Sequence, residues 1–401
     1  MRHLFFSLLI LLASCASQKI TPPSTPSFNT VAELDQYLET SFAASSLPGT
    51  SIIVFDTTGV TYQKAMGYAD LATRRPFDEH TVMNIASISK TFLAVALMKA
   101  VDQGKLKLDD DVNKYLSFPV INPHFPNVPI TVRHLATHTS SIRDTKYYAH
   151  AYFFPNADRL TKDSLAGIYR NYLKVIKGNE RMDESLLLEH ILRPGGKYYS
   201  PKNFHKEPPG KQADYSNLGA TLAALVIEKA TGVKYEDYTR REIFEPLGMS
   251  ETWWEAAAVP AGRFATRYFS KDLRVPDYSL LTRADGGVIT TTSDLMRFMM
   301  EMIRGFEGGG SLLSRAGFEI MLSKQFDRGG YDRGIFWELS KEADGFRHDG
   351  SDPGVTTFLS YNANRQRAMV LFTNLEVSKE SYPEMNKLWN ATGKFSFPAK
   401  E

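Results

Sequence analysis

The stretch Asn84-Ile-Ala-Ser87-Ile-Ser-Lys90-Thr-Phe92 contains the only S-x-x-K pattern in this 401-residue chain. It opens an amphipathic segment from Ala86 to Gly104, which predicts a helix that Gly104 ends. Residues three apart lie on one face of a helix, so Ser87 and Lys90 meet at its N-terminal end. A hydroxyl beside a base at that position is what an activated nucleophile requires. Alone the pattern is weak, because composition gives about one or two matches in a chain of this size.

Strand signals precede this helix and return only near the C-terminus. Residues 51–55 form a continuous apolar run, which predicts a strand covered on both faces, with residues 60–66 as its hairpin partner. Between residues 106 and 275 the patterns are those of helices and loops. We therefore predict one sheet built from both ends of the chain, with a helical insertion. Further strands are expected at 286–291, 334–338, 355–361 and 367–374, and helices at 218–230 and 382–392.

The composition is that of an ordinary globular protein, with 43% hydrophobic and 23% charged residues. The 47 basic and 45 acidic residues give a formal net charge of +2 and are spread along the chain. The sequence has neither a basic run nor a zinc-knuckle spacing. We therefore expect no nucleic-acid partner.

The first fifteen residues have the pattern of an export signal. Arg2 precedes the apolar run Leu4 to Leu12, which is too short to span a bilayer but fits a signal-peptide core. The run ends in Leu12-Ala-Ser-Cys15, which resembles a bacterial lipobox, and Cys15 is the only cysteine. We expect residues 1–15 to be a lipoprotein signal peptide with its lipobox, and 16–28 to be a flexible tether. An ordinary cleavage site with a chance cysteine is the alternative.

Tyr215-Ser-Asn217 is a second candidate segment, directly before the helix predicted at 218–230. A phenol can act as a base if a nearby cation favours the phenolate. The alternative is a tyrosine packed against the helix, with Asn217 as its N-cap.

His348-Asp-Gly350-Ser351 is a third candidate segment, at the entry to the strand predicted at 355–361. Gly350 would let a substrate approach the backbone closely. The N–H groups of Ser351 and Ser87 could then pair as an oxyanion hole. By itself, His348 is more commonly a packed or surface histidine than a catalytic one.

Two further patterns carry less weight. His134-Leu-Ala-Thr-His138 has the histidine spacing of a zinc helix, but it lacks the glutamate of H-E-x-x-H and no third ligand is indicated. Gly308-Gly-Gly310 lacks the strand–helix context of a phosphate-binding loop. We expect a structural helix segment and a loop, with no metal ion.

Taken together and in this order, S-x-x-K, Y-x-N and H-x-G resemble the motifs of the serine β-lactamase and penicillin-binding protein family, in its class C-like branch. That branch includes DD-peptidases, D-amino-acid peptidases and esterases. The resemblance implies an α+β fold, in which an antiparallel sheet is flanked by helices and carries an inserted all-helical lobe. It covers most of residues 30–395, and further matching segments are 130–140, 209–210, 243–249, 284–288, 292–295 and 350–354.

The resemblance also implies a role for each motif residue. Ser87 is the nucleophile, and Lys90 and Tyr215 share the general-base work. Asn217 binds the amide on the acyl side of the substrate, and His348 stands where other members have a lysine. No cofactor or metal is implied. The catalytic domain is expected over 29–396, with an α/β part at 29–105 and 276–396 and the helical lobe at 106–275.

Three positions depart from the family pattern. His348 and Asp349 replace the Lys and Thr of a Lys-Thr-Gly motif, and Ser141 replaces a glycine. An unperturbed histidine is mostly neutral at pH 7.5, and Asp349 adds a negative charge on the opposite strand face. Neutral esters or amides should therefore react faster than anionic β-lactams. Protonation of His348 at lower pH should improve the reaction with β-lactams.

We expect a serine hydrolase that forms an acyl-enzyme with ester, D-peptide or other amide substrates. Its partner is then a small-molecule or peptide acyl substrate. One alternative is a non-catalytic penicillin-binding or acyl-binding surface lipoprotein on the same fold, since fold does not fix function. A true β-lactamase is the other.

The lipobox predicts an exported protein that a lipid on Cys15 alone holds to a membrane, facing the periplasm or the cell exterior. The Cys15→Ser precursor should therefore move from the detergent-extracted fraction to the soluble fraction after cell lysis. Immunoblots of the two fractions measure this. A wild-type protein that is already soluble would make Cys15 part of an ordinary cleavage site.

Overall fold

The computed structural model describes residues 26–328, 331–340 and 344–397. The expected signal peptide, Cys15 and most of the expected tether lie outside these residues. Within the described part of the chain, no helix combines the length and the apolar character needed to cross a membrane.

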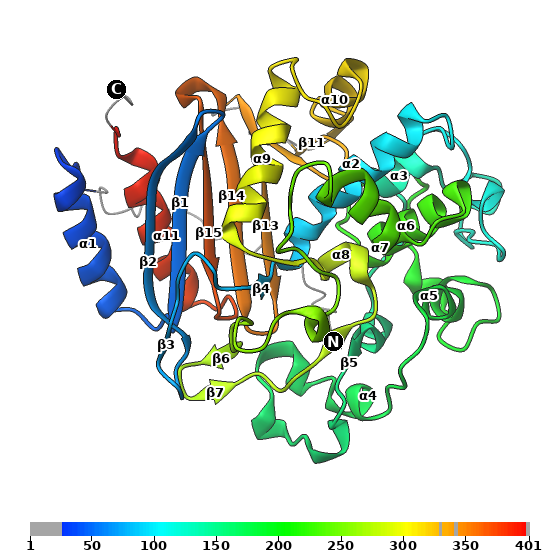
Figure 1. Ribbon diagram of the computed structural model, residues 1–401. Coiled ribbons are helices and arrows are strands. Elements are labelled where there is room, and N and C mark those ends of the chain that lie inside the picture. Colours follow the sequence, from blue (N-terminus) through cyan, green and yellow to red (C-terminus); the bar gives the residue numbers. More distant parts are fainter. Residues whose placement is uncertain (1–25, 329–330, 341–343, 398–401) are drawn as a thin grey trace, which may run out of the picture.

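The described residues form a sheet of nine strands, and every neighbouring pair in it is antiparallel (Figure 1). Strands from the two ends of the chain meet in the middle, where β1 pairs with β15. The antiparallel sheet implied by the family resemblance is therefore confirmed. In spatial order the strands are β10 (Phe326–Arg328), β11 (Tyr331–Arg333), β12 (Glu338–Ser340), β13 (Gly345–Asp352), β14 (Val355–Asn362), β15 (Arg367–Thr373), β1 (Gly49–Asp56), β2 (Gly59–Asp70) and β3 (Arg75–Pro76).

The strand β1 shows why a continuous apolar run belongs in this sheet. Its residues from Gly49 to Phe55 are all buried. Successive side chains point to opposite faces, so Ile53 and Phe55 join the larger core while Ile52 and Val54 join a smaller one. The prediction of a strand covered on both faces is confirmed.

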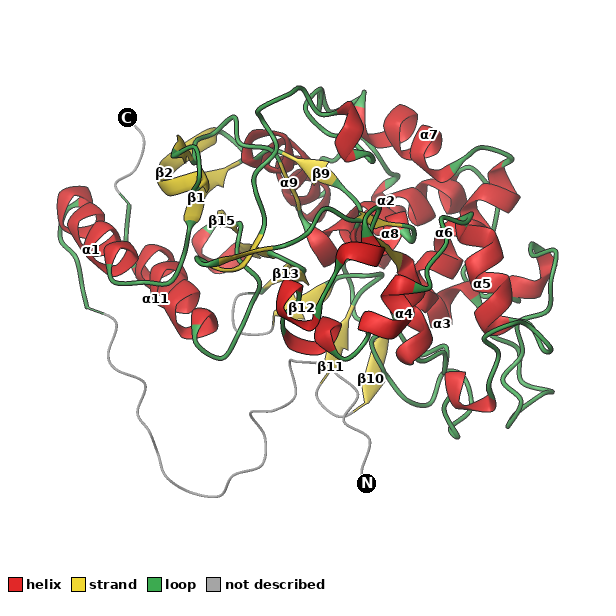
Figure 2. Ribbon diagram, turned by 90° about the horizontal axis from the view of Figure 1, so that it is seen from below, coloured by secondary structure: helices red, strands yellow, loops and turns green. Residues whose placement is uncertain are grey.

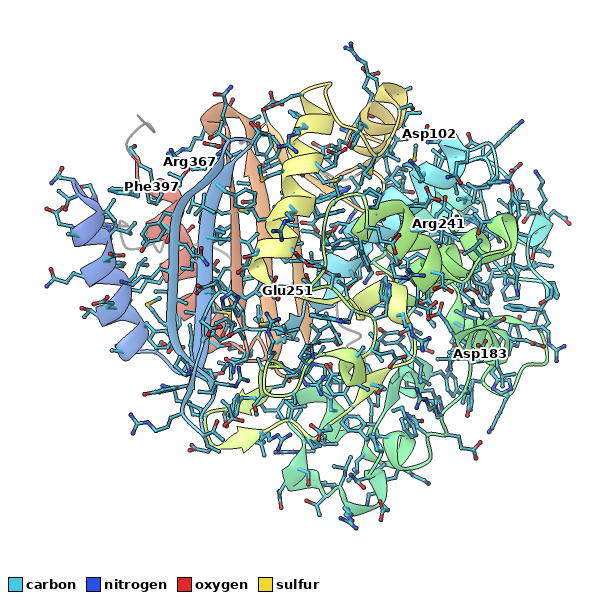
Figure 3. All side chains as sticks on the ribbon, viewed as in Figure 1. Asp102, Asp183, Arg241, Glu251, Arg367 and Phe397 are labelled. Atoms are coloured by element: carbon cyan, nitrogen blue, oxygen red, sulfur yellow. The ribbon has the colours of Figure 1, made fainter. Side chains whose placement is uncertain are left out.

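Helices cover both faces of the sheet. On one face, α1 (Val31–Ala43) and α11 (Ser381–Lys394) lie side by side and enclose the smaller core (Figures 1 and 2). On the other face lie α9 (Thr292–Phe306) and α2 (Ser89–Asp102), and α10 (Arg315–Met321) packs against both of these helices (Figure 1). Asp102, labelled in Figure 3, accepts hydrogen bonds from the Ser314 N–H and hydroxyl at 2.7 and 2.8 Å and so joins the end of α2 to the start of α10.

The inserted lobe lies against α2 on the side away from the sheet (Figure 1). One hydrophobic core runs from the sheet through α2 into this lobe, so the two parts are interlocked. The lobe is mostly helix and loop, but it is not all-helical, because residues 106–275 also contain β5 (Tyr152–Phe153), β6 (Tyr268–Ser270) and β7 (Leu273–Arg274). Its helices are α3 (Val132–Ala136), α4 (Leu173–Lys177), α5 (Glu184–Leu192), α6 (Asn217–Thr231) and α7 (Tyr235–Thr239).

Two predicted strands are wrong in part. Residues 286–291 contain the end of α8 (Arg283–Gly286) and only the two-residue strand β9 (Ile289–Thr290), which pairs with β4 (Met83–Asn84). Residues 334–337 are buried but irregular, because Phe336 has φ 54° and its N–H bonds to the end of α3. An apolar run signals burial in both cases, whereas its backbone is set by the elements around it.

Candidate active site

Ser87 lies in a short 3₁₀ turn, Ala86–Ile88, directly before α2. The predicted helix from Ala86 is therefore this turn followed by an α-helix that begins at Ser89. Ala86 has φ 47°, a left-handed conformation that is uncommon for a residue with a side chain. From Thr81 to Met98, Ser87 is the only residue that keeps partial exposure. The turn thus presents one hydroxyl from an otherwise buried segment.

The Ser87 turn is held between the sheet and the segment after α8. The Ile85 N–H donates to the Val288 carbonyl at 3.0 Å, and the Ile85 carbonyl accepts from the Thr357 hydroxyl at 3.0 Å. Gly350 of β13 lies against this turn, and a Cβ there would be 2.4 Å from the Ile85 carbonyl oxygen and 3.1 Å from the Ser87 nitrogen. The space opened by Gly350 is therefore taken by protein backbone rather than by a substrate. Ser351 follows on the same strand.

The amino group of Lys90 is fully buried and contacts three oxygen atoms. These are Ser87 Oγ at 3.2 Å, Asn217 Oδ1 at 2.7 Å and the Asp285 carbonyl at 2.5 Å. The amide and carbonyl oxygens can only accept, so they take two of the hydrogens on Nζ. The contact with the Ser87 hydroxyl can run in either direction. A proton can therefore pass between Ser87 and Lys90 without rearrangement of the other contacts.

Tyr215 lies over the same amino group, with Lys90 Nζ 4.8 Å from its ring centre. The ring of His138 stacks on its other side at a centroid distance of 4.4 Å. Burial raises the pKa of Tyr215, and the charge of Lys90 opposes that rise. The phenol is therefore protonated at neutral pH. Its buried hydroxyl forms no hydrogen bond of full geometry among the described residues, but it lies close enough to Lys90 and Ser87 for both side chains to oppose the rise in its pKa.

His348 is also buried beside Tyr215, at a ring-centroid distance of 6.5 Å. Its Nδ1 lies 2.7 Å from the Asp349 carbonyl, which can only accept, so Nδ1 carries the proton. Nε2 then presents a lone pair and has no partner within the described part of the chain. Burial lowers the pKa of His348 to about 4, and Lys90 and Arg333 contribute to that shift. His348 is thus a neutral acceptor, and its protonation between pH 5.5 and 8.5, expected from the sequence, does not occur.

Asn217 is positioned by Asp144, which the sequence analysis missed. The Asp144 carboxylate accepts from the N–H groups of Asn217 and Leu218 at 2.7 and 3.0 Å and from the Ser216 hydroxyl at 3.1 Å. A carboxylate at a helix N-terminus satisfies unpaired donors and the positive end of the helix dipole. The N-cap of α6 is Ser216, not Asn217, which leaves the Asn217 amide for Lys90. Asp144 follows the matching segment 130–140 by four residues, which was its only sequence signal.

Two more buried carboxylates adjoin the site, and both lie in the matching segments 284–288 and 350–354, although the sequence assigned them no role. Asp285 accepts from the Tyr148 hydroxyl at 2.6 Å, and Asp352 accepts from the Tyr152 hydroxyl at 2.6 Å. Burial raises the pKa of Asp285 to about 7 and that of Asp352 to about 6, while Lys90 opposes both shifts. Both tyrosines come from residues 146–153, so hydrogen bonds join this part of the inserted lobe to the two carboxylates.

The two histidines with zinc-like spacing do not converge on one point. His134 Nδ1 accepts the Thr131 N–H at the start of α3, at 3.2 Å, whereas His138 lies beyond the end of that helix and accepts the Ser216 N–H at 3.2 Å. Among the described residues, no group of three or more His, Cys, Asp and Glu side chains is placed to hold a metal ion. The two histidines accept hydrogen bonds from separate backbone N–H groups, and the ring of His138 packs on Tyr215.

The departure at Ser141 has a backbone explanation. Its φ of 66° lies in the left-handed region, where glycine is free of steric cost. The Ser141 hydroxyl accepts a hydrogen bond from Asn122 Nδ2 at 2.9 Å, which offsets part of that cost.

A family model described as Beta-lactamase matches residues 34–394. Penicillin-binding protein 4* of Bacillus subtilis strain 168 is 27% identical over 342 residues, covering 80% of this chain and 67% of that protein. The human mitochondrial serine beta-lactamase-like protein LACTB is 31% identical over 284 residues, covering 62% of this chain and 52% of LACTB. The chain thus spans about two thirds of the first relative and about half of the second.

A peptidase and a protein of known structure are also similar to this chain. The D-alanyl-D-alanine-carboxypeptidase/endopeptidase AmpH of Escherichia coli K12 is 26% identical, with 75% of this chain and 69% of AmpH covered. The octameric penicillin-binding protein homologue from Pyrococcus abyssi is 25% identical and superimposes with a TM-score of 0.69, covering 91% of this chain and 78% of that one.

If Asp144 positions Asn217, its replacement should slow chemistry at Ser87. In Asp144→Asn, an amide NH₂ group would face the helix N–H groups, so α6 should lose about 1 kcal/mol and shift at its start. We expect the rate of covalent labelling by a fluorophosphonate probe to fall at least tenfold. The control is Asp183→Asn, which makes the same charge change at the N-cap of α5; Asp183 is labelled in Figure 3. Equal labelling rates in the two variants, at similar melting temperatures, would refute the positioning role.

Proposed function

The chain belongs to the β-lactamase family, and we propose that it is a serine hydrolase that forms an acyl-enzyme on Ser87 with ester, D-peptide or other amide substrates. One observation carries this proposal. Ser87 is the single partly exposed residue of an otherwise buried segment, and its hydroxyl lies 3.2 Å from Lys90 Nζ. A nucleophile within hydrogen-bond reach of a positioned base is the basis of acyl-enzyme chemistry.

In the proposed first step, Ser87 Oγ attacks the substrate carbonyl carbon as its proton passes to Lys90 Nζ in the neutral, unprotonated form of that amine. The raised pKa of Tyr215 favours this route over a phenolate base. The protonated phenol can instead donate its proton to the leaving oxygen or nitrogen, and Lys90 can then return a proton to it. The N–H groups of Ser87 and Ser351 are the proposed oxyanion hole. Water then attacks the ester on Ser87 and releases the acid.

The retained proton machinery argues against a non-catalytic binding protein on this fold. A surface that only bound penicillin or acyl groups would not need a buried amine with three positioned oxygen partners, because burying an amine is costly unless it is paired. The relatives named as penicillin-binding protein and D-alanyl-D-alanine-carboxypeptidase/endopeptidase make D-peptides candidate substrates.

The protonation state of His348 affects whether the site prefers neutral or anionic substrates. With a pKa of about 4, His348 offers a lone pair at neutral pH and no positive charge. An anionic ring carboxylate would therefore gain no attraction from this position, whereas a neutral ester loses nothing. We propose that neutral esters or amides are preferred over penicillins.

The nucleophile is tested by Ser87→Ala. This variant should lose hydrolysis of p-nitrophenyl acetate and labelling by a fluorophosphonate. Its melting temperature should stay nearly unchanged, because the Ser87 hydroxyl contacts Lys90 in the site and Ser87 is not among the buried residues. Intact-mass spectrometry measures the label. Ser89→Ala is the contrasting control, since it removes a buried hydrogen bond to Val288 and should lower the melting temperature while the label is retained. Full labelling of Ser87→Ala would show that another residue is the nucleophile.

The substrate preference is tested by comparing two chromogenic substrates from pH 5.5 to 8.5. At pH 7.5 we expect kcat/KM to be higher for p-nitrophenyl acetate than for a chromogenic cephalosporin. Because the pKa of His348 is about 4, the ratio of the two values should not shift toward the cephalosporin as the pH falls to 5.5. A cephalosporin value above the ester value would indicate a true β-lactamase. A His348→Lys variant should improve the cephalosporin reaction selectively.

A further inference from the structure

A cavity of about 210 Å³ lies on the face of the sheet opposite Ser87, between β13, β14 and α11. It exists because successive residues of β13 point to opposite faces. His348 points toward the active site, whereas its neighbour Asp349 lines this cavity. Arg347, Phe358, Tyr382, Asn386 and Trp389 also line it.

Five of the twelve residues that line the cavity are aromatic, and most of the others are polar. Phe358 contacts Tyr382 and Trp389 edge-on, at ring-centroid distances of 6.3 and 5.7 Å. Tyr382, Asn386 and Trp389 are spaced by four and three residues on α11, so they share one face of that helix. Aromatic side chains can pack against the apolar part of a small molecule, and the face of a ring can attract a cation.

Asp349 supplies the charge. Its carboxylate forms no hydrogen bond to any described residue, and Arg347, two positions earlier on the same face, pairs with Glu338 at 3.2 Å. Burial raises the pKa of Asp349 to about 6, with Arg347 opposing the shift and Glu338 adding to it. At pH 7.5 the carboxylate is therefore mostly ionised. Arg347 also lines the cavity and partly compensates the charge of Asp349. Because its guanidinium pairs with Glu338, the Asp349 carboxylate can still accept hydrogen bonds from a further partner of opposite charge.

We propose that this cavity is a second binding site, separate from the Ser87 site, that takes a small organic ammonium ion. Asp349 is its counter-ion, and Tyr382 and Trp389 pack on its apolar part. The charge of Asp349 disfavours an anion, and a neutral apolar ligand would remove water from the carboxylate without replacing its hydrogen bonds. An ammonium group supplies both the charge and the N–H donors.

The proposal is tested with benzylammonium as the probe, benzyl alcohol as its neutral analogue and benzoate as its anionic analogue. Each is titrated into the purified full-length protein at pH 7.5, with isothermal titration calorimetry as the readout. We expect saturable binding of one benzylammonium per chain, with benzyl alcohol and benzoate at least tenfold weaker. Equal affinities for the cation and the alcohol, or the absence of saturation, would overturn the proposal.

Two variants locate the site. Asp349→Asn and Trp389→Leu should each weaken benzylammonium binding at least tenfold, whereas Asp158→Asn, which removes an exposed carboxylate elsewhere, should leave it unchanged. Unchanged affinity in both Asp349→Asn and Trp389→Leu would place binding elsewhere and refute the site.

The pH dependence is an independent check on the wild-type protein and needs no folded variant. The charged and titratable groups around Asp349 are Arg347, Glu338 and Tyr382. Protonation of Asp349 below about pH 6 removes the counter-ion, so affinity should be about tenfold weaker at pH 5.0 than at pH 7.5. Equal affinity at both pH values would contradict Asp349 as the counter-ion.

Discussion

The burial of the Lys90 amino group is the constraint on which the rest of the site depends. A buried amine is tolerated only where oxygen atoms surround it, and here they come from three separate parts of the chain. Ser87 belongs to the turn before α2, Asn217 to the start of α6, and the Asp285 carbonyl to α8. The same contacts that satisfy the amine therefore fix the inserted lobe and the α8 segment around the proposed nucleophile.

Further hydrogen bonds position Asn217 and Asp285, which contact Lys90. Asp144 satisfies the first N–H groups of α6, which sets the position of Asn217. Tyr148 and Tyr152 reach Asp285 and Asp352 from the inserted lobe. The inserted lobe thus holds the residues around Lys90 in place. A substitution in the lobe can therefore alter the position of Ser87 without contacting the substrate. Gly350 completes the arrangement from the sheet side, because any side chain there would push β13 away from the Ser87 turn.

His348 and Asp349 are neighbours on β13, so their side chains lie on opposite faces of the sheet. His348 is buried next to Lys90 and Arg333, so both desolvation and charge keep it neutral. Its proton is directed to the Asp349 carbonyl, which leaves Nε2 as an acceptor beside Tyr215. Asp349 does not act on the Ser87 side, because the alternation of the strand sends its carboxylate into the cavity under α11.

Sequence alone determined the elements whose signals are local. The two-sided strand at 51–55, the strands at 355–361 and 367–374 and the helices at 218–230 and 382–392 are all present. Periodicity and helix-ending glycines encode such elements within a few residues. The motif resemblance also indicated which side chains would gather around Ser87. Sequence patterns failed at 334–338, because an apolar run records burial and not backbone conformation.

Only the tertiary structure decided the chemistry of the gathered residues. Whether Tyr215 is a phenol or a phenolate depends on its burial against the charge of Lys90, and these residues are 125 positions apart. The ordinary pKa of histidine suggested a switch at His348, but burial removes it. Asp144 had no local pattern to mark it, because its partners lie more than 70 residues away. Protonation and hydrogen bonding depend on neighbours in space, and the fold alone brings those neighbours together.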